Sequence, residues 1–255
     1  MRNFLSLILS LMFATMFCGC TFNQEEPKYM KYEDFCCCYV ADAYAKNSIT
    51  KKYATGVNIL ELVEEAKEKE TIVIPETIDG LPVIAIGMGG LGWTLYLQGY
   101  YNKIYLPDSV LNIHDVGRSI HHRKVFLTDE YGSVDWDSRT TLLQNILLEF
   151  SDMQVFVAES LYQGYQTLSN IKNSECISIA NLSYIVDNEI YWIDDYSNGE
   201  YINFPNQPIK QGYVFEGWYK DEGFLQEWVE EIDQYQKSED SISVKLYAKF
   251  VIEEE

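Results

Sequence analysis

The stretch Ile72-Val-Ile-Pro-Glu-Thr-Ile-Asp-Gly-Leu-Pro-Val-Ile-Ala-Ile-Gly87 decides the fold of the first half of this chain. Its apolar residues alternate before Pro75 and resume at Ile78, Val83, Ile84 and Ile86, which is typical of a short buried strand, a corner and a second short strand. A related pattern returns at residues 104–113 and, with weaker agreement, at residues 147–156. A recurring unit of this kind buries its apolar side chains only against its neighbours, so the sequence predicts a solenoid.

Residues 72–91 resemble the BspA-type leucine-rich repeat, whose units begin with an Ile-x-Ile/Leu-Pro strand and continue through Val, Ile-Gly, Ala-Phe and Leu. Ile86-Gly87 occupies the Ile-Gly position, and Gly90-Leu91 stands where Ala-Phe is usual. The second copy keeps the Leu-Pro, Val and Ile positions, and the third has Phe in the position of Pro. The resemblance implies a leucine-rich-repeat solenoid, and the uneven spacing of the copies implies insertions between coils.

The composition argues against several classes of function. The chain has 255 residues, with 39 Asp and Glu against 19 Lys and Arg, and a formal net charge of −20. Nucleic-acid binding and docking of a folded surface on anionic lipid both need basic side chains, so we expect neither. The hydrophobic fraction of 47% and the aromatic fraction of 15% suit a β-rich protein with well-filled cores.

The first twenty residues have the pattern of an export signal. Arg2 is the only early charge, an apolar run extends from Phe4 to Phe17, and Gly19-Cys20 closes it. The run is shorter than the roughly 20 residues of a membrane-spanning helix. The Gly-Cys end resembles a bacterial lipobox, which implies cleavage before Cys20, acylation of its thiol and attachment to the membrane through lipid alone. Plain secretion is the alternative.

Residues 21–56 are predicted to form a tether and an N-terminal segment that contains Cys36, Cys37 and Cys38. Zinc sites need spaced pairs such as Cys-x-x-Cys, and adjacent residues of a strand point to opposite faces. We therefore expect these cysteines to be small apolar residues of a strand, with no metal and no cofactor. A disulfide formed after export is the alternative.

Residues 57–173 are predicted to form the repeat domain. Residues 57–69 fit a short amphipathic helix or a polar hairpin that caps the first coil, since the end of a solenoid needs a polar cap. Residues 119–137 are polar and irregular, and are interpreted as an insertion. The three histidines of the chain lie between the second and third copies and lack the spacing of a metal motif.

Aromatic residues gather at Trp93, Tyr96, Tyr100 and Tyr101, beside a glycine-rich turn. We favour the interpretation that they pack around a corner of the coil. The alternative is an exposed platform that stacks on sugars or contacts a partner, because aromatic side chains serve both uses. These four residues are the candidate binding residues of the chain.

After residue 173 the pattern changes. Residues 183–186 and 189–193 read as strands, and later stretches read Gly-Tyr-Val-Phe-Glu-Gly-Trp-Tyr and Leu-Tyr-Ala-Lys-Phe. These motifs resemble the Listeria–Bacteroides repeat, a small module of bacterial surface proteins, over residues 181–251. The resemblance implies a β-grasp-like fold of mixed strands with one short helix, for which residues 224–232 are the candidate.

The Gly-Tyr-Val-Phe-Glu-Gly-Trp-Tyr stretch can also be interpreted without the family. Tyr213, Phe215 and Tyr219 share one strand parity and are expected to face the core together. A bulge at Gly217 would bring Trp218 to the same side. Trp218 is therefore predicted to be a core residue, and an exposed ligand anchor is the alternative.

Together these patterns predict a mainly β protein, in which a short irregular leucine-rich-repeat solenoid is followed by a small β-grasp-like α+β module over residues 174–255. No nucleophile elbow, phosphate loop, zinc motif or dinucleotide fingerprint is present in the sequence. We expect a non-catalytic cell-surface lipoprotein that mediates adhesion or protein–protein interaction, with an extracellular protein or glycan as its ligand. A carbohydrate-binding lipoprotein for glycan capture is the alternative, and a hydrolase is a third hypothesis.

Overall fold

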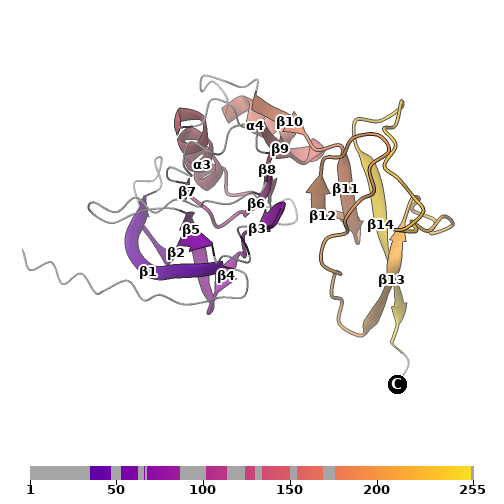
Figure 1. Cartoon of the computed structure of the whole chain (residues 1–255), viewed down its shortest axis with the longest axis horizontal. Helices are drawn as coiled ribbons and strands as arrows, with labels where there is room; N and C mark the ends of the chain where they lie inside the picture. The colour runs from indigo at the N-terminus through magenta and orange to yellow at the C-terminus, as the bar shows by residue number, and fades with distance from the viewer. Residues whose placement is uncertain are drawn as a thin grey trace, which may run out of the picture.

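The computed structural model describes the following residues: 35–46, 53–62, 66, 68–86, 102–113, 124–129, 134–149, 154–168 and 176–253. Strands dominate the described residues, as the sequence predicts, and they form three sheets (Figure 1). Two of these sheets lie in the first part of the chain. The third sheet is formed by the C-terminal strands.

The first sheet opens with an antiparallel hairpin of β1 (Phe35–Lys46) and β2 (Tyr53–Leu62). β2 runs parallel to β5 (Leu81–Ile86), which also pairs with β4 (Thr77–Ile78) and β7 (Asn112–Ile113). The strand predicted around the three cysteines is confirmed. The helix predicted as one alternative for residues 57–69 is wrong over its first six residues, which belong to β2. β2 lies between β1 and β5 and is buried on both faces, so its apolar residues do not alternate as those of a half-exposed strand do.

The second sheet consists of parallel strands in chain order: β3 (Thr71–Val73), β6 (Lys103–Pro107), β8 (Lys124–Thr128), β9 (Gln154–Val157) and β10 (Ile177–Ile179). Neighbouring strands pair in register along the sheet. The two strands predicted from the first and second copies of the repeat, β3 and β6, are confirmed. Sequential parallel pairing is the arrangement that stacked units produce.

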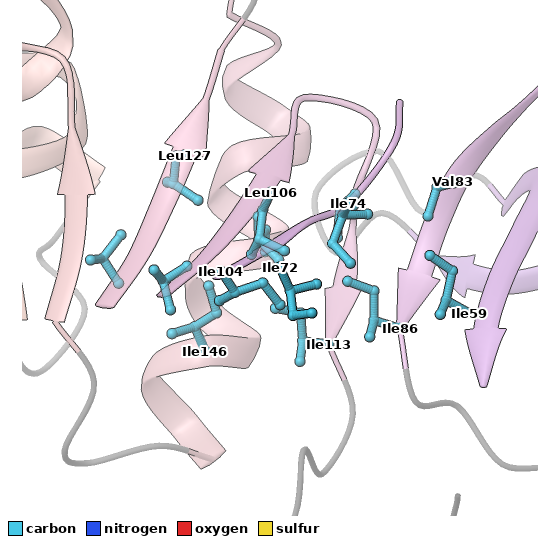
Figure 2. Packing of buried hydrophobic residues seen from close by; sticks show 14 of the residues in the cluster. Ile59, Ile72, Ile74, Val83, Ile86, Ile104, Leu106, Ile113, Leu127 and Ile146 are labelled. Carbon is cyan, nitrogen blue, oxygen red and sulfur yellow. The ribbon is translucent and has the colours of Figure 1, made fainter. Parts of the chain in front are cut away.

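One row of aliphatic side chains crosses the second sheet. Register pairs Ile72 with Ile104, Ile104 with Val125, Val125 with Val155, and Val155 with Ile177, and all five side chains are buried. Figure 2 shows side chains of this core together with residues of the first sheet and of α3 (Trp136–Glu149). Burying each such side chain contributes about 1.5–3 kcal/mol, so this row is a main source of stability.

The third copy of the repeat is placed wrongly by the sequence pattern. Residues 147–149 end α3, and the strand of that region is β9, seven residues after the predicted start. In the second sheet the neighbour of β6 is β8, which lies within the stretch interpreted as a polar insertion. The central Val-Phe-Leu of β8 is buried on both faces of the sheet, so its sequence does not alternate between apolar and polar residues. It is followed by Thr128 and not by the expected Pro.

The C-terminal sheet has the order β12-β11-β14-β13. β11 (Leu182–Val186) and β14 (Val244–Ile252) are parallel in its centre, and β12 (Glu189–Asp194) and β13 (Tyr213–Tyr219) are antiparallel to their neighbours. The two strands predicted at the start of this part are confirmed. The helix expected at residues 224–232 is not formed, and turns occupy that segment.

The bulge predicted in β13 is present between Phe215 and Gly217. Trp218 is a core residue, as predicted, with 2% of its surface exposed and its ring edge-on to Tyr184 at 4.9 Å. The prediction that Tyr213, Phe215 and Tyr219 face the core together is wrong for Tyr213, whose side chain is 42% exposed. The bulge reverses the parity of the strand, so Tyr219 instead packs on Phe224, outside the main core cluster.

Candidate interaction surface

The predicted lipidation residue and the four candidate binding residues lie outside the described part of the chain. These are Cys20, Trp93, Tyr96, Tyr100 and Tyr101. The three histidines lie outside it as well. A lipid anchor and an aromatic platform at these positions therefore stay predictions.

A row of stacked aromatic rings covers the second face of the parallel sheet. Tyr105, Phe126 and Phe156 are register partners on β6, β8 and β9. Their ring centroids lie 4.6 Å and 5.0 Å apart, with nearly parallel planes. They stand on the face opposite the aliphatic row, because each follows an aliphatic residue of its strand. Trp192 of β12 stacks on Tyr105 at 4.5 Å, so this row receives the C-terminal sheet.

Two ion pairs flank the aromatic contact. Lys103 Nζ lies 2.8 Å from Asp194 Oδ1, and Lys124 Nζ lies 2.5 Å from Asp195 Oδ2. The side chain of Asp194 is only 5% exposed. A pair so poorly solvated is costly to break, since removing one partner leaves the other charge buried and uncompensated. Lys103 Nζ also lies 4.1 Å from the centre of the Tyr196 ring, a cation–π contact.

Tyrosine hydroxyls complete the surroundings of Asp194. Burial raises the pKa of Tyr105 well above its ordinary value, and the negative charge of Asp194 raises it further. The pKa of Tyr196 is raised by the same two causes in the same order. Both hydroxyls therefore stay protonated at physiological pH. Asp194 Oδ1 thus accepts hydrogen bonds from Lys103 Nζ and from the backbone N–H of Asp195, and the Tyr196 hydroxyl donates to the carbonyl of Asn203.

A cavity of about 420 Å³ lies beside this junction. Leu127, Ala158 and Leu161 line it from the parallel sheet and its connections, and Ile185, Ile190 and Trp192 line it from the C-terminal sheet. Tyr191 and Ile193 also line it, together with the polar residues Thr128, Asp129, Glu159, Ser160, Ser183, Asn188, Glu189 and Lys245. The volume is in the range of small-ligand sites, and mixed linings of this kind occur there.

A buried charged cluster closes the wall behind the cavity. Arg139 of α3 is fully buried and pairs with Asp129 at the end of β8, while its Nε lies 3.1 Å from Asp108 Oδ1. The hydroxyl of Tyr165 on α4 (Tyr162–Leu168) donates a hydrogen bond to Asp129. Burial raises the pKa of Asp129, and Arg139 and the Tyr165 hydroxyl oppose this effect. The cluster therefore ties two helices to the ends of two strands.

Within the described ranges, no group of three or more His, Cys, Asp or Glu side chains is arranged to hold a metal ion. No helix described by the structure combines the length and apolarity needed to cross a membrane. The aromatic row was missed in the sequence, although its signal is there. The motifs Ile-Tyr-Leu-Pro, Val-Phe-Leu-Thr and Val-Phe-Val-Ala each carry an aromatic residue between two inward-facing aliphatic ones.

The sequence profile of the Listeria-Bacteroides repeat domain matches residues 181–249. The match begins one residue before β11 and covers β12, β13 and most of β14, so it coincides with the C-terminal sheet. The matched residues are therefore similar to a surface-associated repeat domain. A search among curated proteins finds no match to the chain.

Proposed function

We propose that this chain is a non-catalytic cell-surface lipoprotein that mediates adhesion or protein–protein interaction. The observation that carries the proposal is the surface-associated repeat domain at residues 181–249, which is docked on a sheet of chain-ordered parallel strands. Aromatic stacking and two lysine–aspartate pairs join the two parts. A joined pair of this kind presents a continuous, preorganised surface, which lowers the entropic cost of binding a partner.

The two parts have separate roles in this proposal. We infer that residues 57–173 form a BspA-type leucine-rich-repeat solenoid, supported by the in-register aliphatic and aromatic rows on the two faces of the parallel sheet. The C-terminal part is a β-grasp-like module, supported by its central parallel pair between two antiparallel strands. Cys20, after the export signal, is the proposed lipid anchor.

Glycan capture is the second candidate function. The junction cavity favours it, because an aromatic side chain there stands beside hydroxyl, amide and carboxylate groups. Sugars use such combinations, in which the aromatic ring contacts the apolar face of the sugar and the polar groups bind its hydroxyls. The anchor and the two-part architecture are common to both candidates.

Immobilised ligands separate the two candidates. Residues 21–255, coupled to microspheres through their N-terminus, are applied to a panel of extracellular matrix proteins and to a glycan array. The proposal expects saturable attachment to one or more of the proteins and none to the glycans. Attachment to glycans alone would support the second candidate. Attachment to neither panel, with beads whose protein melts cooperatively, would contradict the adhesive function.

A further inference from the structure

The connection between β13 and β14 displays large apolar side chains. Leu225 is 86% exposed and Ile232 is 73% exposed, and Phe224 and Val229 are also exposed. All four belong to residues 221–233, hereafter the acidic loop. Loops normally present polar side chains to water, and exposed apolar groups concentrated on one segment mark contact surfaces.

The exposure of these side chains is not caused by a lack of packing. Trp228, in the middle of the acidic loop, is buried in the core of the C-terminal sheet. Its backbone N–H donates to the carbonyl of Trp218 at 2.8 Å, and the Lys220 N–H donates to the carbonyl of Gln226. The chain thus pins the loop to β13 through Trp228 and turns Leu225 and Val229, on either side, outward.

Two aspartates fix the backbone of the acidic loop. The carboxylate of Asp221 accepts the N–H groups of Leu225 and Gln226, the latter at 2.8 Å. The intervening Phe224 has a φ of 54°, a left-handed conformation that is unfavourable for an aromatic residue and persists only where its surroundings impose it. The carboxylate of Asp233 accepts the N–H of Val229 at 2.7 Å.

The charge of the loop defines the chemistry of its partner. Residues 221–233 contain six Asp and Glu, the two aspartates included, and no Lys or Arg. Four exposed glutamates, Glu222, Glu227, Glu230 and Glu231, border the apolar side chains. An anionic membrane or a nucleic acid would repel this surface, and a second copy of the loop would do the same. A protein surface with an apolar groove bordered by Lys or Arg is complementary to it.

We propose that the acidic loop is a protein-binding site, in which Leu225 and Ile232 enter an apolar groove of the partner and the glutamates contact its basic rim. The inference rests on the proposed function and names the contact point on this chain. Because the backbone is already held by Asp221 and Asp233, little conformational entropy is lost on binding. The apolar contacts supply affinity, and the charges select the partner and speed its approach.

Three synthetic peptides test the site on residues 21–255 in solution. A short amphipathic helix of Leu and Lys reproduces the partner chemistry, a Leu–Glu peptide reverses the charge, and a Ser–Lys peptide removes the apolar face. Calorimetric titration is expected to show saturable binding of the Leu–Lys peptide only. The variant Leu225→Ser/Ile232→Ser should weaken that binding by at least about tenfold. Ile209→Ser is the matched control, because Ile209 is 99% exposed in a different connection, and its binding should equal that of the wild type.

Several results would overturn the inference. These are absence of binding to the wild type, equal binding of the Ser–Lys peptide, an unchanged affinity of the double variant, or an equal loss in Ile209→Ser. If the double variant unfolds at a lower temperature than the wild type, Glu230→Gln/Glu231→Gln replaces it, and weaker binding with a smaller salt dependence is then expected. The bead assay tests the adhesive function separately from the acidic loop. If beads that carry the wild type and beads that carry the double variant adhere equally, the acidic loop is not the binding site and the proposed adhesive function still holds.

Discussion

Trp192 of β12 stacks on Tyr105 of β6, with their ring centroids 4.5 Å apart. The two residues are 87 positions apart in the chain and belong to different sheets. Tyr105 is itself the first ring of the aromatic row, so the contact extends a stack that begins on the parallel sheet. The surface-associated repeat domain is therefore held by direct side-chain packing on the preceding part of the chain.

Replacing Trp192 should uncouple the two parts of the protein. Trp192→Ala removes the ring that rests on Tyr105, at an expected cost of about 1–3 kcal/mol for a partly buried aromatic pair. Hydrogen exchange should become faster in β6 and β12 before it changes in β13 and β14. Tyr201→Ala, which removes an exposed ring of the same module, is the control and should leave the hydrogen exchange of β6 unchanged. Unaltered protection of β6 and β12 in Trp192→Ala would show that the stack does not couple them.

The two classes of ion pair should differ in energy. Lys103→Ala leaves Asp194 poorly solvated and without its lysine, so about 3–5 kcal/mol of unfolding free energy should be lost. Lys210 forms a pair with Asp187 in which the two side chains are 33% and 60% exposed. Lys210→Ala should change the free energy by less than about 1 kcal/mol. Denaturant melts of both variants measure the difference, and equal losses would contradict the role given to Asp194 at the junction.

Arg139 should be essential to the packing of α3 and α4. Arg139→Leu leaves Asp129 buried without its cation, at an expected cost of about 3–5 kcal/mol at pH 7. Burial raises the pKa of Asp129, so its neutral form is the one the fold prefers once Arg139 is gone. A raised pKa gives stability that is present at low pH and is lost as the pH rises through the folded-state value. The deficit of Arg139→Leu should therefore shrink on acidification, and Arg139→Leu/Asp129→Asn should recover part of it at pH 7.

Asp233 gives a pH dependence of the opposite sign. The hydrogen bond from Lys220 lowers its pKa, and the hydrogen bond from the Val229 N–H lowers it further. A lowered pKa gives stability that is present above the unfolded-state value and is lost as the pH falls through the folded-state value. Asp233→Ala should therefore be less stable than wild type at pH 7, and this deficit should shrink as the pH falls through the folded-state pKa. Thermal melts at pH 7 and at acidic pH check this, and a deficit that stays constant would contradict the role of the carboxylate charge.

Much of the fold can be predicted from the sequence where a strand keeps the repeat motif. Ile72 lies between two exposed neighbours, and Leu106-Pro107 marks β6 although that strand is buried on both faces. Val125, Phe126 and Leu127 of β8 are also all buried, and no Pro follows them, so β8 shows neither the alternation nor the motif. The helix expected in the acidic loop fails because Asp221 and Asp233 bind backbone N–H groups, which favours turns over a helical ladder.

The contact surface was less predictable than the fold. Trp218 could be assigned to the core because its own strand motif contains the bulge that turns it inward. Trp192 could not be paired with Tyr105, because nothing in either local pattern encodes a contact between different sheets. The exposed Leu225 and Ile232 resemble core residues in sequence, and only the burial of Trp228 between them reveals which side of the loop faces water.

The proposed surface function depends on display of the chain outside the cell through Cys20. The most direct measurement is proteinase K treatment of intact bacteria that express the full chain or Cys20→Ala, followed by immunoblotting of cells and medium. The account predicts a cell-associated, protease-sensitive wild-type chain, and a variant that is released to the medium or retained as the longer precursor. A wild-type chain that stays protected inside intact cells, or a variant that remains on the cell surface like the wild type, would contradict it.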